Sequence, residues 1–176
     1  MINLFVIKER EEIPLTEEEK IELAKKSYKT LCDTFEEKKL VFNKDEENLS
    51  ISTKLNGRSG TIDVLMRIYS EQSLVRVFIP LPVIVKEDKR LDVAVAVSYV
   101  NATLGEGNFD FDIVSGRLAY KLANSFIESE LGGDLFSYML FCAYTTVDNN
   151  ISKLMAIANG LLTLNDFIKE ASAGEE

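Results

Sequence analysis

The chain has no histidine among its 176 residues. Histidine is the commonest general base and metal ligand, and it is the side chain that changes charge near neutral pH. Without it, Ser-His-Asp and Cys-His catalytic arrangements are excluded. Cysteine is also scarce, because Cys32 and Cys142 are too few for a zinc site without other ligands. Both occupy apolar positions of predicted helices, so we expect them to be small core residues in a reducing compartment.

Long hydrophobic runs are missing as well, and no apolar segment is long enough to cross a bilayer. The apolar run Ile2–Ile7 is too short for a signal peptide, lacks a basic flank before it and leads into the charged run Lys8–Glu12. The net charge of −9 argues against the clustered Lys and Arg side chains that nucleic acid or an anionic membrane requires. We therefore expect a cytoplasmic protein with no nucleic-acid partner and no membrane partner.

The composition that is present fits one globular domain. Hydrophobic residues make up 46% of the chain and charged residues 28%, which is the balance of a folded chain rather than a disordered one. A chain of this length is expected to bury a single core. We expect residues 1–15 to form an N-terminal arm, residues 16–160 a single domain, and residues 161–176 a short C-terminal helix with a loose tail.

The first half of the chain predicts a helix followed by a three-stranded meander. Thr16-Glu-Glu-Glu19 has the pattern of a capping box, and the apolar spacing that follows predicts an amphipathic helix over residues 16–39. Three alternating segments come next and predict strands over residues 49–55, 62–68 and 75–79. Pro80 and Pro82 cannot donate to a ladder, so the third strand should end there or lie at an edge.

The strand register follows from the alternation of apolar residues. With a four-residue loop after the second strand, one face pairs Ile68 with Val75, Met66 with Val77 and Val64 with Ile79. The same register sets large side chains on the opposite face, with Leu65 next to Phe78 and Tyr69 next to Leu74.

The segment Leu91–Leu104 is ambiguous by periodicity alone. Its alternating valines suit a strand, but Val93, Val97, Val100 and Leu104 also recur at helical steps. Its length, and Gly105 just past its end, favour a helix. A second side of small and apolar residues indicates that this helix is buried on two sides.

A hairpin and a long helix complete the predicted elements. A two-residue Ser115-Gly116 loop would place Ile113 opposite Leu118, Phe111 opposite Tyr120, Phe109 opposite Leu122 and Asp110 opposite Lys121. Asp134 would then cap a helix whose apolar stripe runs to Gly160.

Two groups of polar residues could carry chemistry, and both have a simpler interpretation. Asp110 and Asp112 share a strand face with Asp63, and paired carboxylates can bind a metal or transfer protons. Lys121 lies opposite, however, and no further ligand converges there, so we interpret them as ordinary exposed charges. The Gly57–Gly60 loop could cradle a phosphate, but it joins two strands and has no helix N-terminus behind it.

The strongest candidate for a functional surface is apolar. Four large side chains, Leu65, Tyr69, Leu74 and Phe78, share what should be the solvent face of the meander, and such patches usually mark contact surfaces. Arg67 and Arg76 come opposite one another between them, which is unfavourable unless the charges are solvated or shared by an anion or acidic partner. The alternatives are that a helix or residues 1–7 of the same chain cover the patch, and that the arginines simply extend into solvent.

The second half of the chain carries a resemblance to a known family. It resides in the apolar segment containing Asn101, the run Gly105-Glu-Gly107-Asn108-Phe-Asp-Phe-Asp112 and the turn Ser115-Gly116-Arg-Leu-Ala-Tyr120, together with the element order. Over about residues 16–160 the chain resembles the YbjN family, described as candidate regulators of bacterial sensory transduction. That family is similar in fold to type III secretion chaperones of the Tir-chaperone type, which are small, acidic, cytoplasmic dimers that hold partly unfolded client segments. The resemblance implies a binding or regulatory protein and brings no established active site.

These observations combine into one expectation. We predict an α+β fold with a single antiparallel sheet of about five strands, in the order helix, three-strand meander, helix, hairpin and long helix, with helices mainly on one face. We predict a homodimer, because the two-sided central helix and the apolar patch exceed what one small chain can cover. We expect a non-enzymatic protein-binding module with an unidentified protein partner and no cofactor. The alternative is a small-ligand sensor with a pocket between sheet and helices, and an enzyme is the poorest fit.

Overall fold

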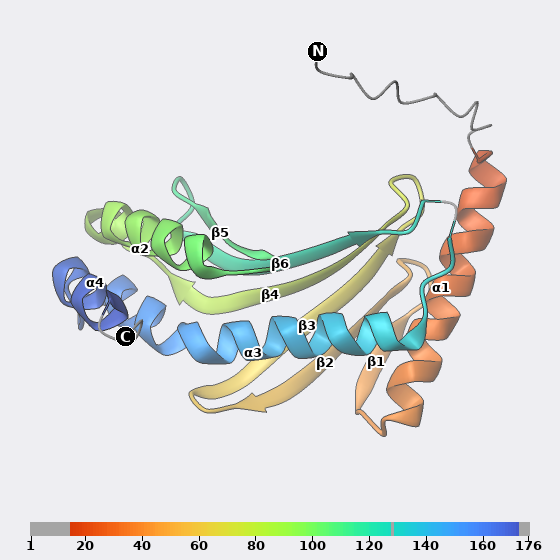
Figure 1. Ribbon diagram of the computed structural model, residues 1–176, viewed down its shortest axis with the longest axis horizontal. Coiled ribbons are helices and arrows are strands. Elements are labelled where there is room, and N and C mark those ends of the chain that lie inside the picture. The colour runs from red at the N-terminus through yellow and green to blue at the C-terminus, as the bar shows by residue number, and fades with distance from the viewer. Residues whose placement is uncertain (1–14, 128, 173–176) are drawn as a thin grey trace, which may run out of the picture.

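The computed structural model describes residues 15–127 and 129–172, and shows an α+β fold with one antiparallel sheet (Figure 1). In these residues the sheet has six strands, in the order β1-β2-β3-β4-β6-β5, and four α-helices accompany it. The elements are α1 (Glu17–Glu37), β1 (Phe42–Asp45), β2 (Ser50–Gly57), β3 (Gly60–Tyr69), β4 (Leu74–Ile84), a short 3-10 helix (Glu87–Lys89), α2 (Arg90–Thr103), β5 (Asn108–Asp112), β6 (Arg117–Ser125), α3 (Gly133–Ala158) and α4 (Leu164–Ser172).

The predicted helices form where the local sequence specifies them. The capping box is present: the Glu19 amide donates to Thr16 Oγ1 at 3.2 Å, and the Thr16 amide donates to the Glu19 carboxylate at 2.8 Å. The segment predicted as a central helix is α2. This confirms the helix that its length favoured over the strand that its alternating valines suggested. At the start of α3 the cap is Gly132 rather than Asp134, which lies within the first turn. The aspartate therefore acts on the helix dipole and not as the N-cap.

The core lies between one face of the sheet and the helices. Alternate residues of β3 and β4 point into it: Ile62, Val64, Met66, Ile68, Val75, Val77, Ile79 and Leu81 are all buried. α3 runs across this face, with α1 near its N-terminal end and α2 and α4 near its C-terminal end (Figure 1). The opposite face of the sheet, called here the outer face, carries the other alternate set of side chains.

α2 is buried on one side only. Val93, Ala96, Val97 and Val100 lie in the core, whereas Leu91 and Val95 are exposed in the described part of the chain. The prediction of burial on two sides is therefore wrong for the single chain. At its end α2 is tied to β5, because the Asn101 amide donates to the Phe109 carbonyl at 2.9 Å and its oxygen accepts from the Phe109 amide at 2.8 Å.

The sheet forks between β3 and β4. These strands pair from Leu65–Tyr69 to Leu74–Phe78, and in the described residues β4 beyond Phe78 pairs only with β6. Pro80 and Pro82 lie in this part of β4, which in the described residues has a paired strand on one side only. The strand continues to Ile84 through an irregular register. The prediction that the strand ends at the prolines is wrong, while the edge alternative is correct, because no ladder to β3 needs their missing N–H groups.

The hairpin of β5 and β6 differs from the predicted register by two residues. Phe109 pairs with Tyr120, Phe111 with Leu118 and Asp110 with Ala119, so the loop has four residues rather than two. The reason is Asp112, whose carboxylate accepts from the Val114 amide at 2.9 Å and the Ser115 amide at 3.2 Å and shapes the longer turn. Gly116 completes this turn with a positive φ of 74°. Asp110 and Lys121 are not directly opposite, but their side chains form an ion pair across the diagonal.

The described residues form six strands where about five were predicted, and the additional strand is β1. It contains a single apolar residue, Phe42, and its other three residues are exposed. An edge strand of this kind has no alternating pattern to detect, so pairing with β2 defines it.

Candidate functional site

The six side chains proposed as a contact surface come together on the outer face. The observed register pairs Leu65 with Phe78, Arg67 with Arg76 and Tyr69 with Leu74, as the alternation predicts. All six are half-buried, and the residues that alternate with them on the two strands, Met66, Ile68, Val75 and Val77, are buried in the core. They form three successive cross-strand rows, called here the outer-face patch.

A hollow of about 510 Å³ opens next to the Leu65–Phe78 row. It lies at the fork of the sheet, between the first half of β3 and the second half of β4, and β1 and β2 also contribute to its lining. Its lining includes Leu65, Phe78, Pro80, Ser52, Lys54 and Asp63. Lys54 and Asp63 form an ion pair of 2.7 Å at this site. The hollow thus has an apolar base and a charged rim.

The two arginines of the patch surround a tyrosine instead of a carboxylate. The guanidinium carbons of Arg67 and Arg76 lie 5.0 Å and 4.9 Å from the centre of the Tyr69 ring. Arg67 also donates to Asn48 Oδ1 at 3.1 Å, but its Nε is buried without a hydrogen-bond partner. Neither arginine forms an ion pair with any carboxylate of the described residues. The cation–π contacts offset part of the repulsion between them.

The carboxylates considered for metal or proton chemistry each have a structural partner. Lys121 pairs with Asp110, and Lys54 pairs with Asp63. Asp112 holds the hairpin turn, and hydrogen bonds from the Ser115 hydroxyl and backbone lower the pKa of its carboxyl. Within residues 15–127 and 129–172, no three Cys, Asp or Glu side chains are grouped as metal ligands would be.

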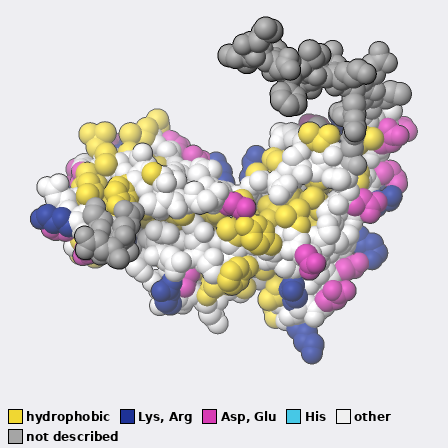
Figure 2. Space-filling view, in the orientation of Figure 1, with side chains coloured by type: hydrophobic (Ala, Val, Ile, Leu, Met, Phe, Trp, Pro, Cys, Tyr) yellow, Lys and Arg dark blue, Asp and Glu magenta, His cyan; other side chains and the backbone are white. Residues whose placement is uncertain are grey.

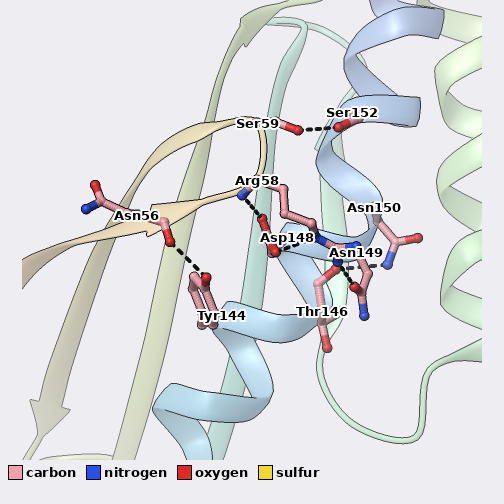
Figure 3. Close-up of polar contacts among 9 residues, drawn as sticks. All are labelled: Asn56, Arg58, Ser59, Tyr144, Thr146, Asp148, Asn149, Asn150 and Ser152. Carbon is pink, nitrogen blue, oxygen red and sulfur yellow. Dashed lines mark hydrogen bonds and ion pairs between the residues drawn. The ribbon is translucent and has the colours of Figure 1, made fainter.

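The Gly57–Gly60 loop is clamped to α3 and is not open to an anion (Figure 3). Asp148 accepts from the Arg58 amide at 2.7 Å and from Arg58 Nε at 2.9 Å. The Arg58 guanidinium also donates to Asn149, Ser59 bonds to Ser152, and the Tyr144 hydroxyl donates to the Asn56 carbonyl at 2.8 Å. A carboxylate of the same chain therefore occupies the position that a phosphate would take. Sequence reasoning missed these α3 residues, whose only signal is the polar run Asp148-Asn-Asn150 beside the apolar stripe.

A second group of apolar side chains is exposed on the helix side. Figure 2 shows hydrophobic side chains exposed on the side of the molecule where α3 lies. In the first half of α3, Tyr138 and Phe141 are 50% and 66% exposed. Leu91 and Val95 of α2 and Val114 of the hairpin tip are exposed as well. Among the described helices, none combines the length and the apolar character that crossing a membrane requires.

Comparison with known proteins places the fold. No protein-family model matches the sequence, and no curated protein matches it. Among solved structures, YbjN from E. coli, described as a candidate transcription regulator, is similar with a TM-score of 0.56 and 13% identity, over 76% of this chain and 92% of that one. The structure of the ExsC–ExsE complex gives a TM-score of 0.54 and 13% identity, over 75% of this chain and 96% of that one.

The fold is type III secretion chaperone-like. The predicted resemblance in fold to YbjN and to these chaperones is thereby confirmed. At this identity the likeness concerns the fold, and the type III secretion chaperone-like fold can carry unrelated functions.

Proposed function

We propose that this chain is a non-enzymatic protein-binding module, chaperone-like or regulatory, and that the outer-face patch is its contact surface. The observation that carries the proposal is the patch itself. Leu65 and Phe78 are only half-buried beside an open hollow, next to two arginines without a carboxylate partner in the described residues. Aromatic side chains and arginine, which the patch contains as Tyr69, Phe78, Arg67 and Arg76, are enriched at interfaces. Residues 16–160 would form the binding domain.

Three further observations support this class over the alternatives. ExsC, which shares the fold, was crystallised as a complex with ExsE, so the fold is compatible with a bound protein. The hollow lies on the outer face, so it gives no support to a ligand pocket between sheet and helices. The carboxylates that could have served an enzyme are engaged in ion pairs and in a turn.

The same proposal includes a homodimer formed through the helix side. Leu91 and Val95 of α2 are 74% and 47% exposed, and Ile113 and Val114 of the neighbouring hairpin tip are 47% and 80% exposed. A two-fold contact would bury this side of α2 against its copy. The outer-face patch would stay available to a partner.

Replacing Leu65 and Phe78 together by Ser tests the surface. Both side chains are only half-buried, so the variant should fold with a melting temperature close to that of the unchanged chain. Capture of partners from native lysate, followed by mass spectrometry, should show proteins that bind the unchanged chain and are lost with the variant. For an identified partner, affinity should fall about 30-fold or more, since truncating central anchors costs roughly 2 kcal/mol.

A matched variant controls for the loss of apolar surface in general. Ile127 and Leu161 are 68% and 83% exposed and lie outside the patch, so replacing both by Ser should leave capture unchanged. Unfolding of the Leu65/Phe78 variant would mean that the face belongs to the intramolecular core. Normal capture by a folded variant would place the contact elsewhere. Either result overturns the proposal.

A further inference from the structure

We propose that the outer-face patch selects an extended partner segment in which an acidic side chain stands two residues from a large apolar one. The inference rests on the proposed function of the patch and adds the chemistry of the partner.

The outer-face patch is positively charged, whereas the molecule as a whole has a negative net charge. The chain has 29 acidic and 20 basic residues, yet Arg67 and Arg76 are directly opposed at the centre of the outer face. Like charges in directly opposed positions destabilise a sheet. The nearby lysines of the same face, Lys54 and Lys121, each pair with a carboxylate, whereas the arginines have none in the described chain.

The arginines present unused donors of the right geometry for a carboxylate. The planar guanidinium fork matches a carboxylate with two parallel hydrogen bonds. In the described residues neither Arg67 nor Arg76 has a carboxylate within ion-pair distance. A partner carboxylate between the two guanidinium groups would relieve the repulsion between them.

The spacing of the rows sets the pattern of the partner. Leu65 precedes Arg67 by two residues on β3, and Phe78 follows Arg76 by two residues on β4. Two residues of a strand span about 7 Å, and alternate side chains of an extended segment face the same way. A segment lying along these strands would therefore place an apolar side chain in the hollow and a carboxylate between the arginines, with one residue between them.

Other anions fit the surface less well. An anionic membrane would meet a molecule whose net charge is −9. A free phosphate would use the arginines but leave the apolar hollow empty. A protein segment uses both features. The chain itself contains the pattern in Ile7-Lys8-Glu9, which makes its own N-terminal segment the competing occupant to be tested.

Three synthetic peptides of equal length test the inference by fluorescence anisotropy with the full chain. Each has a Thr and Val background, and they contain Phe-Thr-Asp, Phe-Thr-Asn or Phe-Asp-Thr at the centre. The Phe-Thr-Asp peptide should bind at least tenfold more tightly than the other two, because only it offers both groups to one face. The advantage should shrink with added salt, since the contact is electrostatic and partly exposed.

Two variants separate this inference from the proposed function. Replacing Arg67 and Arg76 by Gln should reduce binding of the Phe-Thr-Asp peptide to that of the amide peptide, which should itself be unchanged. Replacing Leu65 and Phe78 by Ser should weaken binding of all three peptides. Replacing Lys29 of α1 and Lys169 of α4 by Gln is the control and should preserve the preference for the acid, because both lysines are exposed on helices away from the outer face.

Each other result overturns the inference. If the acid and amide peptides bind equally well, the patch has no preference for an acidic side chain. If that binding is also lost in the Leu65/Phe78 variant, the proposed function still stands. Binding unaffected by either variant would remove both proposals, and no binding of any peptide would remove the inference. If the peptides bind only when Ile7→Ser and Glu9→Gln are introduced into the full chain, the occupant is its own N-terminal segment and not a partner.

Discussion

Arg58 and Asp148 are 90 residues apart in the sequence and joined by two hydrogen bonds, one from the Arg58 backbone amide and one from its side chain. The Asp148 side chain is only 9% exposed, whereas that of Arg58 is 69% exposed. The contact fastens the β2–β3 loop to the middle of α3. Hydrogen bonds from the Arg58 side chain and backbone, together with its charge, lower the pKa of the Asp148 carboxyl.

The first prediction concerns the pH dependence of this clamp. Because the pKa of Asp148 is lowered from 3.8 in the folded chain, its ionised form stabilises the fold above that pH. The stabilisation should be lost as the pH falls below 3.8 through the lowered value. Thermal unfolding of the unchanged chain and of Asp148→Asn should therefore show a difference at pH 7 that disappears in acid. A difference that does not shrink as the pH falls below 3.8, or none at pH 7, would contradict the prediction.

The second prediction concerns the glycine that precedes Arg58. A Cβ at Gly57 would lie 2.6 Å from Asp148 Oδ1 and 2.8 Å from Ile62 Cδ1, so Gly57→Ala should displace the clamp. Overpacking of this kind costs roughly 1–3 kcal/mol in the free energy of unfolding, measured by urea denaturation. Gly105→Ala is the matched control, because a Cβ there meets nothing within 4 Å. Equal stability of the two variants would contradict the prediction.

The third prediction concerns Asn101. Its side chain satisfies both polar groups of the Phe109 backbone, and the Phe109 side chain is only 2% exposed. Asn101→Ala would leave two unpaired polar groups near the core, at a cost of roughly 1–3 kcal/mol. Urea denaturation should report the loss, and hydrogen exchange of the Phe109 amide should accelerate. Asn124→Ala, at an exposed position, should change neither. An unchanged exchange rate at Phe109 would refute the role assigned to Asn101.

The fourth prediction concerns the dimer. At tens of micromolar, light scattering should give twice the 19.8 kDa mass of the chain. Leu91→Lys with Val95→Lys should give a monomer that keeps its fold, because both side chains are exposed on α2. Ile127→Lys with Leu161→Lys should remain dimeric. A monomer mass for the unchanged chain would exclude the dimer, and a dimeric Leu91/Val95 variant would place the contact elsewhere.

The pairing of two strands could be predicted from the sequence where the residues on both faces of the strands restrict the register. On β3 and β4 the core alternation leaves one pairing, and that pairing positions the outer-face patch, including the Arg67–Arg76 pair. The predicted register was wrong where hydrogen bonds from a side chain determine the length of the turn between two strands. The Asp112 carboxylate lengthens the β5–β6 turn and shifts the hairpin by two residues, although the apolar pattern permits either register.

The missed parts of the site depend on contacts between distant segments. The hollow arises because β3 and β4 separate beyond Phe78, and no local pattern around Pro80 distinguishes a strand end from a fork. The clamp joins residues 90 positions apart, so neither Arg58 nor Asp148 has a neighbour in the sequence that indicates its partner. Such pairs become visible only when α3 is placed across the sheet.

The fork also changes what connects the two halves of the sheet. In the described residues no backbone ladder joins β3 to β4 beyond Phe78, so β1–β3 and β4–β6–β5 lose their shared backbone hydrogen bonds there. α3 packs on β4 and β6, and the Arg58–Asp148 clamp ties the β2–β3 loop to that same helix. α3 and the clamp therefore connect the two halves of the sheet across the fork, on the face opposite the hollow.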